Sequence, residues 1–437
     1  MLILDAERAI GIDTFFSKNK GIGGKLRFLP DDFIVDEISV YPPKKENGAY
    51  TIAEVSTKNW ETNLLIRTMA KRLHIARSRI SFSGTKDKRA TTTRLMSFMQ
   101  VPLETLNKLK IKNVEIKNAY TSDKPVTIGD HVGNSFSITI RNIEPMVTVK
   151  DIKDTLSPIL SANGFPNFYG IQRFGITRPL THLIGKHIIL GEFKEAVMTY
   201  IAEPFEGEDE QLYSLRKRVR KTNDYSEALK QYPDNLTFEK AILNRLVNKP
   251  DDFINALTVL PKNLLTMFVY AYQSYIFNKI LSERIKKGLP LNQAIPGDIV
   301  VPMSQGITKK DYSVVVTPDN ITKVNKQLNK GRACVTGLLI GHSSLFAKGE
   351  MGEIEHDIIN SEKIDPRDFI VPELPFLSSA GSRRSLLARL LNFKYEYNED
   401  NLNPGKKALH LEFTLDKGCY ATSLLREIMK ADNIKCY

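Results

Sequence analysis

The longest strongly apolar segment of the chain, residues 263–287, is the feature that most constrains its fold. The segment has the sequence NLLTMFVYAYQSYIFNKILSERIKK, in which apolar side chains occur on almost every side of a helix. A helix that is apolar almost all round is buried inside a protein. No apolar run in the chain reaches the length of a membrane span. The segment therefore predicts the core helix of a domain in the middle of the sequence.

The two ends of the chain have a different pattern, in which alternating strands dominate. In residues 134–141, the side chains of Phe136, Ile138 and Ile140 alternate with polar ones, as in a strand with one buried face. Further strands are predicted at residues 33–40, 49–56, 93–101, 114–120 and 407–415. A helix at residues 420–430 follows the last of them. We expect the two ends to complete one sheet.

This arrangement predicts an α+β protein in which a middle domain is inserted between the two halves of another. We place the first half at residues 1–190, the insertion at 191–375 and the second half at 376–437. A charge switch also suggests a boundary, because the acidic stretch at residues 201–213 precedes the basic segment RKRVRK at 216–221. This basic segment is either a phosphate-contacting patch or a solvated helix face.

Charge and cysteine content narrow the class of protein. The 437 residues carry a formal net charge of +12, which suggests a polyanionic partner, nucleic acid first and an anionic membrane second. The three cysteines lie far apart and the seven histidines show no ligand spacing, so we expect neither disulfide nor metal site. Asp5 and Glu7 stand where a signal peptide carries basic residues, so we expect a cytoplasmic protein.

Eight Lys or Arg residues and a single acid occur in residues 71–94. The acid, Asp87, lies in a predicted turn. A helix at residues 60–73, with Asn59 as its N-cap, leads into the stretch. Nearby positive charge favours an ionised carboxylate, which suits a nucleophile whose polyanionic substrate is held by the cations. The alternative is a solvated basic helix and a charged turn, in which Asp87 pairs with a neighbour.

A segment rich in aromatic residues, GFPNFYGIQRFG, occupies residues 164–175. Aromatic faces beside a cationic groove hold single-stranded or flipped bases. The alternative is a glycine-punctuated loop that covers a core, and most aromatic clusters are of this kind.

Five motifs in family order resemble the TruD family of tRNA pseudouridine synthases. They are PDDFIVDE at residues 30–37, SGTKDKRATTTR at 83–94, PNFYGIQRFG at 166–175, AYQSYIFNKIL in the middle domain and GCYATSLLREIM at 418–429. Each motif alone is weak, but five in this order span nearly the whole chain and are specific. The archaeal and eukaryotic branch of the family is the more similar one.

The resemblance implies a pseudouridine-synthase core with a mixed, largely antiparallel sheet, interrupted by an inserted α/β TRUD domain. It implies that the N-glycosidic bond of a uridine in tRNA is broken, and that the base is rotated and rejoined through carbon without a metal or cofactor. The usual target is the thirteenth nucleotide, in the D-stem. We accordingly expect tRNA as the partner, no membrane binding, no small-molecule cofactor and a monomer.

Carried over residue by residue, the resemblance implies that Asp87 is the catalytic carboxylate. It would attack the sugar or the base, or initiate an elimination. Asn167 would hydrogen-bond near that carboxylate and the target nucleotide, and Tyr169 would stack on the flipped base. Phe33 and Tyr420 match positions that contact the substrate.

Three cations are further candidates for the site. Arg426 either supplies the ion pair that pseudouridine synthases place beside the catalytic acid or faces solvent on its helix. Arg27 stands where many relatives have a lysine. The planar guanidinium of arginine is not equivalent to the compact ammonium group of lysine. Lys86 is either an active-site cation or a phosphate contact.

A function of another class would fit the basic composition as well, namely an RNA-binding or RNA-folding protein without essential catalysis. The presence of Asp87 beside Asn167 and Tyr169 argues against it, because binding alone requires no carboxylate among cations. A P-loop NTPase is excluded because G-x-x-x-x-G-K-[ST] is missing. A membrane-surface protein lacks support, since no strongly amphipathic basic helix carries exposed Trp or Phe.

Overall fold

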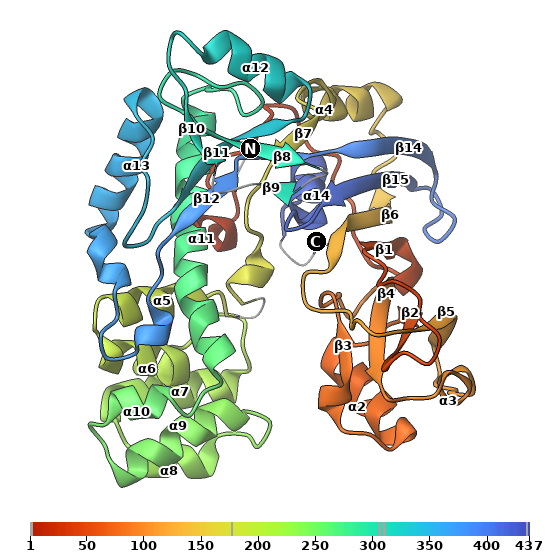
Figure 1. Cartoon of the computed structure of the whole chain (residues 1–437). Helices are drawn as coiled ribbons and strands as arrows, with labels where there is room; N and C mark the ends of the chain where they lie inside the picture. Colours follow the sequence, from red (N-terminus) through yellow and green to blue (C-terminus); the bar gives the residue numbers. More distant parts are fainter. Residues whose placement is uncertain (1–2, 176–177, 305–306, 309–311, 434–435) are drawn as a thin grey trace. The chain divides into compact units, whose positions relative to one another are not determined.

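The computed structural model describes residues 3–175, 178–304, 307–308, 312–433 and 436–437 (Figure 1). The chain forms two compact units. Unit 1 comprises Met1–Phe15, Pro166–Pro302 and Lys309–Leu387, and unit 2 comprises Phe16–Phe165, Met303–Thr308 and Ala388–Tyr437.

Unit 2 is built around a mixed eight-stranded sheet. Its strands are β1 (Phe33–Ser39), β2 (Tyr50–Lys58), β3 (Ile80–Phe82), β4 (Thr91–Met99), β5 (Val114–Ser122), β6 (His131–Ile143), β14 (Leu391–Glu399) and β15 (Lys407–Asp416). Its helices are α2 (Thr62–Leu73), α3 (Leu103–Asn107), α4 (Val149–Ser161) and α14 (Ala421–Met429). The strand order is β14-β15-β6-β1-β4-β2-β5, with β3 paired to β4 (Figure 1). β1 and β4 run parallel, whereas the other strand pairs of this sheet are antiparallel.

The two ends of the sequence meet in this sheet. β15 pairs with β6, so that Leu411 lies opposite Ile138, and both side chains are fully buried. Leu424 and Leu425 of α14 pack into the same core. The prediction that the two ends complete one sheet is therefore confirmed.

Helix α2 leads into the basic stretch, as predicted, but begins differently. Its N-cap is Glu61, whose carboxylate accepts hydrogen bonds from the backbone N–H groups of Asn63 and Leu64. The prediction of Asn59 as N-cap is wrong. Asn59 follows β2 with a φ of 60°, a left-handed conformation that asparagine adopts more readily than most residues.

Unit 1 surrounds the long apolar segment, which forms α11 (Lys262–Lys286). The other helices are α1 (Asp5–Arg8), α5 (Thr181–Ile189), α6 (Phe193–Ala202), α7 (Glu210–Thr222), α8 (Tyr225–Gln231), α9 (Thr237–Asn248), α10 (Phe253–Leu257), α12 (Ile321–Asn329) and α13 (Gly349–Glu362). α5, α13 and β11 (Ala333–Leu339) pack against α11, and Phe277 and Ile280 of α11 are fully buried. The prediction of a buried core helix is confirmed.

A second sheet has the strand order β10-β8-β11-β12, with β9 paired to β8. Three of its strands lie wholly in unit 1, namely β10 (Val314–Val315), β11 and β12 (Ser382–Ser385). Four short strands lie where the chain passes between the units, namely β7 (Gly164–Pro166), β8 (Ile299–Ser304), β9 (Ile307–Thr308) and β13 (Leu387–Arg389).

The compact units have other bounds than the predicted insertion at residues 191–375. The second segment of unit 1 begins at Pro166 and not near residue 191, because α5 packs on α11. The boundary suggested by the charge switch at residues 201–221 is wrong, since α6 and α7 pack together within unit 1. Arg216 of the basic segment is buried and donates to the Glu208 carboxylate, whereas Lys217, Arg218 and Lys221 are exposed, as on a solvated helix face.

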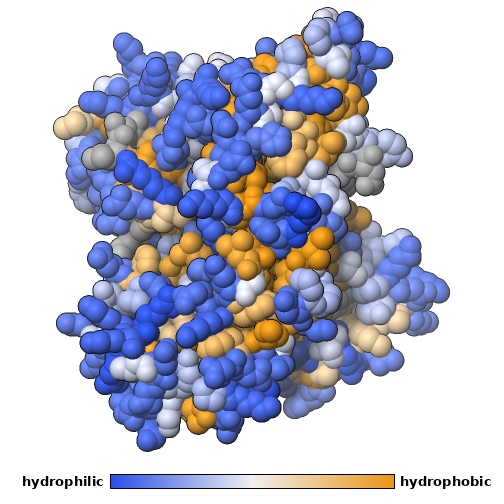
Figure 2. All heavy atoms as spheres, turned by 90° about the vertical axis from the view of Figure 1, so that its left-hand side faces the viewer, coloured by the Kyte–Doolittle hydropathy of each residue, from blue (hydrophilic) through white to orange (hydrophobic). Residues whose placement is uncertain are grey.

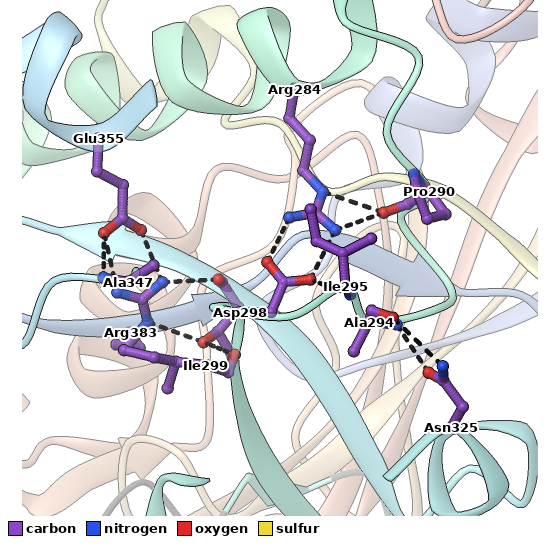
Figure 3. Close-up of polar contacts among 11 residues, drawn as sticks. Arg284, Pro290, Ala294, Ile295, Asp298, Ile299, Asn325, Ala347, Glu355 and Arg383 are labelled. Carbon is purple, nitrogen blue, oxygen red and sulfur yellow. Dashed lines mark hydrogen bonds and ion pairs between the residues drawn. The ribbon is translucent and has the colours of Figure 1, made fainter. Parts of the chain in front are cut away.

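Two buried ion pairs join helices to strands within unit 1 (Figure 3). Arg284 of α11 makes a two-pronged contact with Asp298, next to β8, with N–O distances of 2.6 and 2.9 Å. Arg383 of β12 lies 2.7 Å from the Glu355 carboxylate of α13. Bidentate arginine–carboxylate contacts restrict orientation as well as distance. They therefore fix β8 and β12 against the helices.

The outer face of unit 1 on the side of α13 and α6 is shown in Figure 2. Hydrophilic side chains cover most of this face, and apolar ones form smaller patches between them. Within the described ranges, no helix combines the length and apolar character that crossing a membrane requires.

Candidate active site

The parallel pairing of β1 and β4 brings two loops of unit 2 together. Ile34 lies opposite Thr91, so the segments that enter these strands meet at one end of the sheet. Arg27 precedes β1 and Asp87 precedes β4. Nη2 of Arg27 donates a hydrogen bond of 3.0 Å to Oδ2 of Asp87, which forms an ion pair.

The Asp87 carboxylate is accessible, whereas its partner is largely covered. The side chain of Asp87 is 51% exposed and that of Arg27 is 13% exposed. In the described part of the chain, Oδ1 of Asp87 has no hydrogen-bond partner, so it is open to a substrate atom. The Arg27 guanidinium lies 4.2 Å from the ring centroid of Phe33, which packs edge-on against Phe136. Burial lowers the pKa of Arg27, and the Asp87 carboxylate opposes that shift.

Lys86 anchors the loop that carries Asp87. Its Nζ lies 2.9 Å from the Glu37 carboxylate and 2.7 Å from Oδ1 of Asn134, two residues that face each other on β1 and β6. The Lys86 side chain is only 6% exposed and that of Glu37 is 0% exposed. The Lys86 backbone also bonds to the Thr62 hydroxyl of α2. Lys86 is thus in a position to hold the loop, with its charge already paired.

We expect Glu37→Gln to lower the melting temperature near neutral pH, because it leaves the Lys86 ammonium buried without its counter-charge. Burial favours the neutral form of Glu37, but the Lys86 charge and neighbouring hydrogen bonds outweigh it and hold the pKa of Glu37 below its ordinary value. A lowered carboxyl pKa stabilises the fold above the unfolded-state pKa, and this stabilisation is lost as the pH falls through the folded-state pKa.

The measurement is thermal unfolding of the natural protein and the variant between pH ~7 and pH ~3. The difference between them should shrink at the acid end. Glu115→Gln is the matched control, since Glu115 forms an exposed pair with Lys117. A difference that stays constant across this range would show that the charge of Glu37 does not stabilise the loop.

Two cations of the basic stretch donate hydrogen bonds to other groups of unit 2. Arg94 is almost fully buried and donates to the hydroxyls of Thr62 and Thr92, and burial lowers its pKa to about 10. Arg79 donates to backbone carbonyls at the end of β4. The exposed cations of the stretch are Lys71, Arg72, Arg77, Lys88 and Arg89. These five can contact a polyanion.

Arg426 does not supply the ion pair of the candidate catalytic acid. Its Nη1 lies 2.7 Å from the Glu427 carboxylate, whereas Asp87 pairs with Arg27. The prediction of an Arg426–Asp87 pair is therefore wrong. The solvent-facing alternative is wrong as well, because α14 is buried on almost every side. Tyr420 is the half-buried N-cap residue of the same helix, and its contact with substrate stays a prediction.

Asn167 and Tyr169 belong to unit 1 and Asp87 to unit 2, so their convergence stays a prediction. Within unit 1, the amide of Asn278 on α11 bonds to both backbone groups of Tyr169, at 2.9 and 3.0 Å. Arg384 of β12 donates to Oδ1 of Asn167 at 2.6 Å, and its guanidinium lies 4.1 Å from the Tyr169 ring centroid. Arg384 is not among the residues predicted from the sequence.

The other aromatic residues of the segment at 164–175 are core residues. Phe165, Phe168 and Phe174 are at most 1% exposed, whereas Tyr169 is 8% exposed. For the three phenylalanines, the interpretation as a loop that covers a core is confirmed. In the described ranges, no group of three or more His, Cys, Asp or Glu side chains is placed to hold a metal ion.

Comparison with known proteins gives the same family over the whole chain. The family model of tRNA pseudouridine synthase D (TruD) matches residues 9–428. A protein of Methanosarcina barkeri named "Probable tRNA pseudouridine synthase D" is 44% identical over 438 residues, which cover 100% of both chains. A protein of Thermococcus sibiricus with the same name is 37% identical and covers 95% of this chain and 97% of its own. A crystal structure of a TruD protein from Methanosarcina mazei is similar, with a TM-score of 0.88 and 42% identity over 99% of each chain.

Proposed function

Because the chain belongs to the TruD family of tRNA pseudouridine synthases, we propose that it isomerises the uridine at the thirteenth nucleotide of tRNA and that Asp87 is its catalytic carboxylate. The protein is an isomerase that modifies tRNA. The residue that carries the chemistry and the uridine that is modified are the proposed parts.

The observation that carries the proposal is the half-exposed Asp87 carboxylate bound by the covered Arg27. Arg27 holds one oxygen and leaves the other to the substrate. A carboxylate of this kind can attack the sugar or the base covalently, or take a proton in an elimination. In each route the N1–C1′ bond breaks, the uracil rotates, and C5 bonds to C1′. C5 then gives up its proton and N1 takes one up, so the product is an isomer of the substrate, and the carboxylate is released unchanged.

Substrate binding has to offset the cost of extruding the base, which is a few kcal/mol. The five exposed cations of residues 71–94 can contact phosphates, and each neutralised phosphate releases counterions. In this proposal, Asn167, Tyr169, Phe33 and Tyr420 contact the target nucleotide or its surroundings. Arg426 and Lys86 stabilise the fold around the site through their carboxylate partners.

The proposal includes the finer architecture that the family implies. Unit 2 is the pseudouridine-synthase core, and the α/β TRUD insertion lies within unit 1. The enzyme acts as a monomer in the cytoplasm and requires no cofactor. Asp87 lies in unit 2, whereas Asn167 and Tyr169 lie in unit 1.

The test is to incubate the purified full chain with unmodified tRNA transcripts and to map pseudouridine by mass spectrometry. We expect one pseudouridine in the D-stem, at the thirteenth nucleotide, and none in a transcript with cytidine there. Pseudouridine at another position would overturn the proposed target and leave the reaction in place. No pseudouridine in any tRNA, from a folded protein, would overturn the proposed function.

A further inference from the structure

We infer that Arg384 is a positioning residue for the RNA substrate, which orients the amide of Asn167 and holds the ring of Tyr169. The inference rests on the proposed function, because it concerns the nucleotide contacts assigned there to Asn167 and Tyr169. It assigns a role to a residue outside the five family motifs.

The position of Arg384 is fixed by its strand. Arg384 lies on β12, opposite Gly337 of β11. Successive side chains of a strand point to opposite faces, so Arg383 and Arg384 diverge. Arg383 is held on its own face by Glu355 (Figure 3). It also donates to the backbone carbonyl and the hydroxyl of Thr336. This anchor leaves Arg384 on a rigid strand, facing Asn167.

The guanidinium decides which way the Asn167 amide points. A guanidinium only donates hydrogen bonds, so the atom that meets it at 2.6 Å has to be the amide oxygen. Nδ2 of Asn167 in turn donates to the carbonyl of Ser385 at 3.0 Å. One N–H of the amide and one lone pair of its oxygen remain for a ligand. Without Arg384, the Ser385 carbonyl alone would set the orientation of the amide.

The same guanidinium covers the ring of Tyr169. Its central carbon lies 4.1 Å from the Tyr169 centroid, and the ring of Phe277 meets Tyr169 edge-on at 5.7 Å. With both contacts, Tyr169 is only 8% exposed. The Arg384 guanidinium thereby also holds the ring of Tyr169 in place.

The test compares Arg384→Ala, Arg384→Lys, Asn167→Ala and the double variant Asn167→Ala with Arg384→Ala, using tRNA and the full chain. We expect Arg384→Ala to lower kcat about 100-fold, whereas KM changes less than about threefold, because phosphate contacts dominate RNA binding. Arg384→Lys keeps the charge but lacks the planar fork, so it should recover at most about a tenth of the activity. In the Asn167→Ala background, loss of Arg384 should cost less than about threefold, because the two act as a unit.

The control is Arg332→Ala, which removes an exposed cation of unit 1 and should leave kcat unchanged. Melting temperatures are measured for every variant. If Arg384→Ala does not fold, Arg384→Lys in both backgrounds gives the same comparison. Equal losses with and without Asn167, or unchanged kcat for Arg384→Ala, would overturn the inference. Failure of the proposed function would instead leave the natural protein without activity on tRNA, so the two failures are distinguishable.

Discussion

Replacing Asp87 by asparagine is expected to abolish pseudouridine formation while tRNA binding stays nearly intact. Asparagine has almost the same shape and still offers an oxygen to Arg27, which now donates to Oδ2 at 3.0 Å. It is neither a nucleophile nor a base, so every route open to the carboxylate is lost. Loss of a group that forms or breaks bonds lowers kcat by at least about a thousandfold.

Binding should survive because its largest contribution comes from phosphate contacts, to which a carboxylate adds only repulsion. Turnover is measured by mass spectrometry, and the dissociation constant is measured by filter binding at one fixed salt concentration. Asp123→Asn is the matched control, because Asp123 is also half exposed and paired with a cation, Lys45. A purified, folded Asp87→Asn protein with undiminished turnover would rule out Asp87 as the catalytic group.

The second large effect concerns stability. We expect Arg284→Met to destabilise unit 1 by about 3–5 kcal/mol, because it leaves the Asp298 carboxylate buried without a counter-charge. Both side chains of the pair are 0% exposed. Arg284 also donates twice to the carbonyl of Pro290, so the variant removes contacts between α11 and the segment that leads to β8.

Urea denaturation of the full chain, followed by tyrosine fluorescence and by circular dichroism, gives the midpoint of each variant. Arg284→Met combined with Asp298→Asn should recover part of the loss, since a neutral amide is less costly to bury than an unpaired carboxylate. Arg220→Ala, which removes a partly exposed pair with Glu195, should leave the midpoint nearly unchanged. Equal midpoints for the natural protein and Arg284→Met would refute the prediction.

Local pattern was sufficient for most of unit 2. Leu411 and Ile138 could be placed in strands because a half-buried strand alternates apolar and polar residues. The burial of α11 could be predicted for a similar reason, since its own apolar residues occur on almost every side of the helix. Asn59 was a poor choice of N-cap because several polar residues precede α2, and only the backbone conformation decides which one caps it.

The candidate site was less accessible to such reasoning, because it depends on contacts between distant segments. The pair of Arg27 and Asp87 results from the parallel pairing of β1 and β4, which no local pattern specifies. Burial of Arg94 could not be foreseen either, since a charged residue in a basic stretch ordinarily faces solvent. For Arg384 the alternation of faces along β12 is informative only once the strand is known, because the sequence pattern predicts no strand at residues 382–385.

The position of β6 in the large sheet has a consequence for biosynthesis. β6 lies between β1 and β15, and β15 is encoded almost at the end of the chain. During translation, the edge of β6 that pairs with β15 therefore remains unpaired until residues 407–416 have left the ribosome. Open edges pair readily with strands of other molecules. A nascent chain that stalls before this point exposes an incomplete sheet with an unpaired strand edge, so completion of unit 2 depends on the last steps of synthesis.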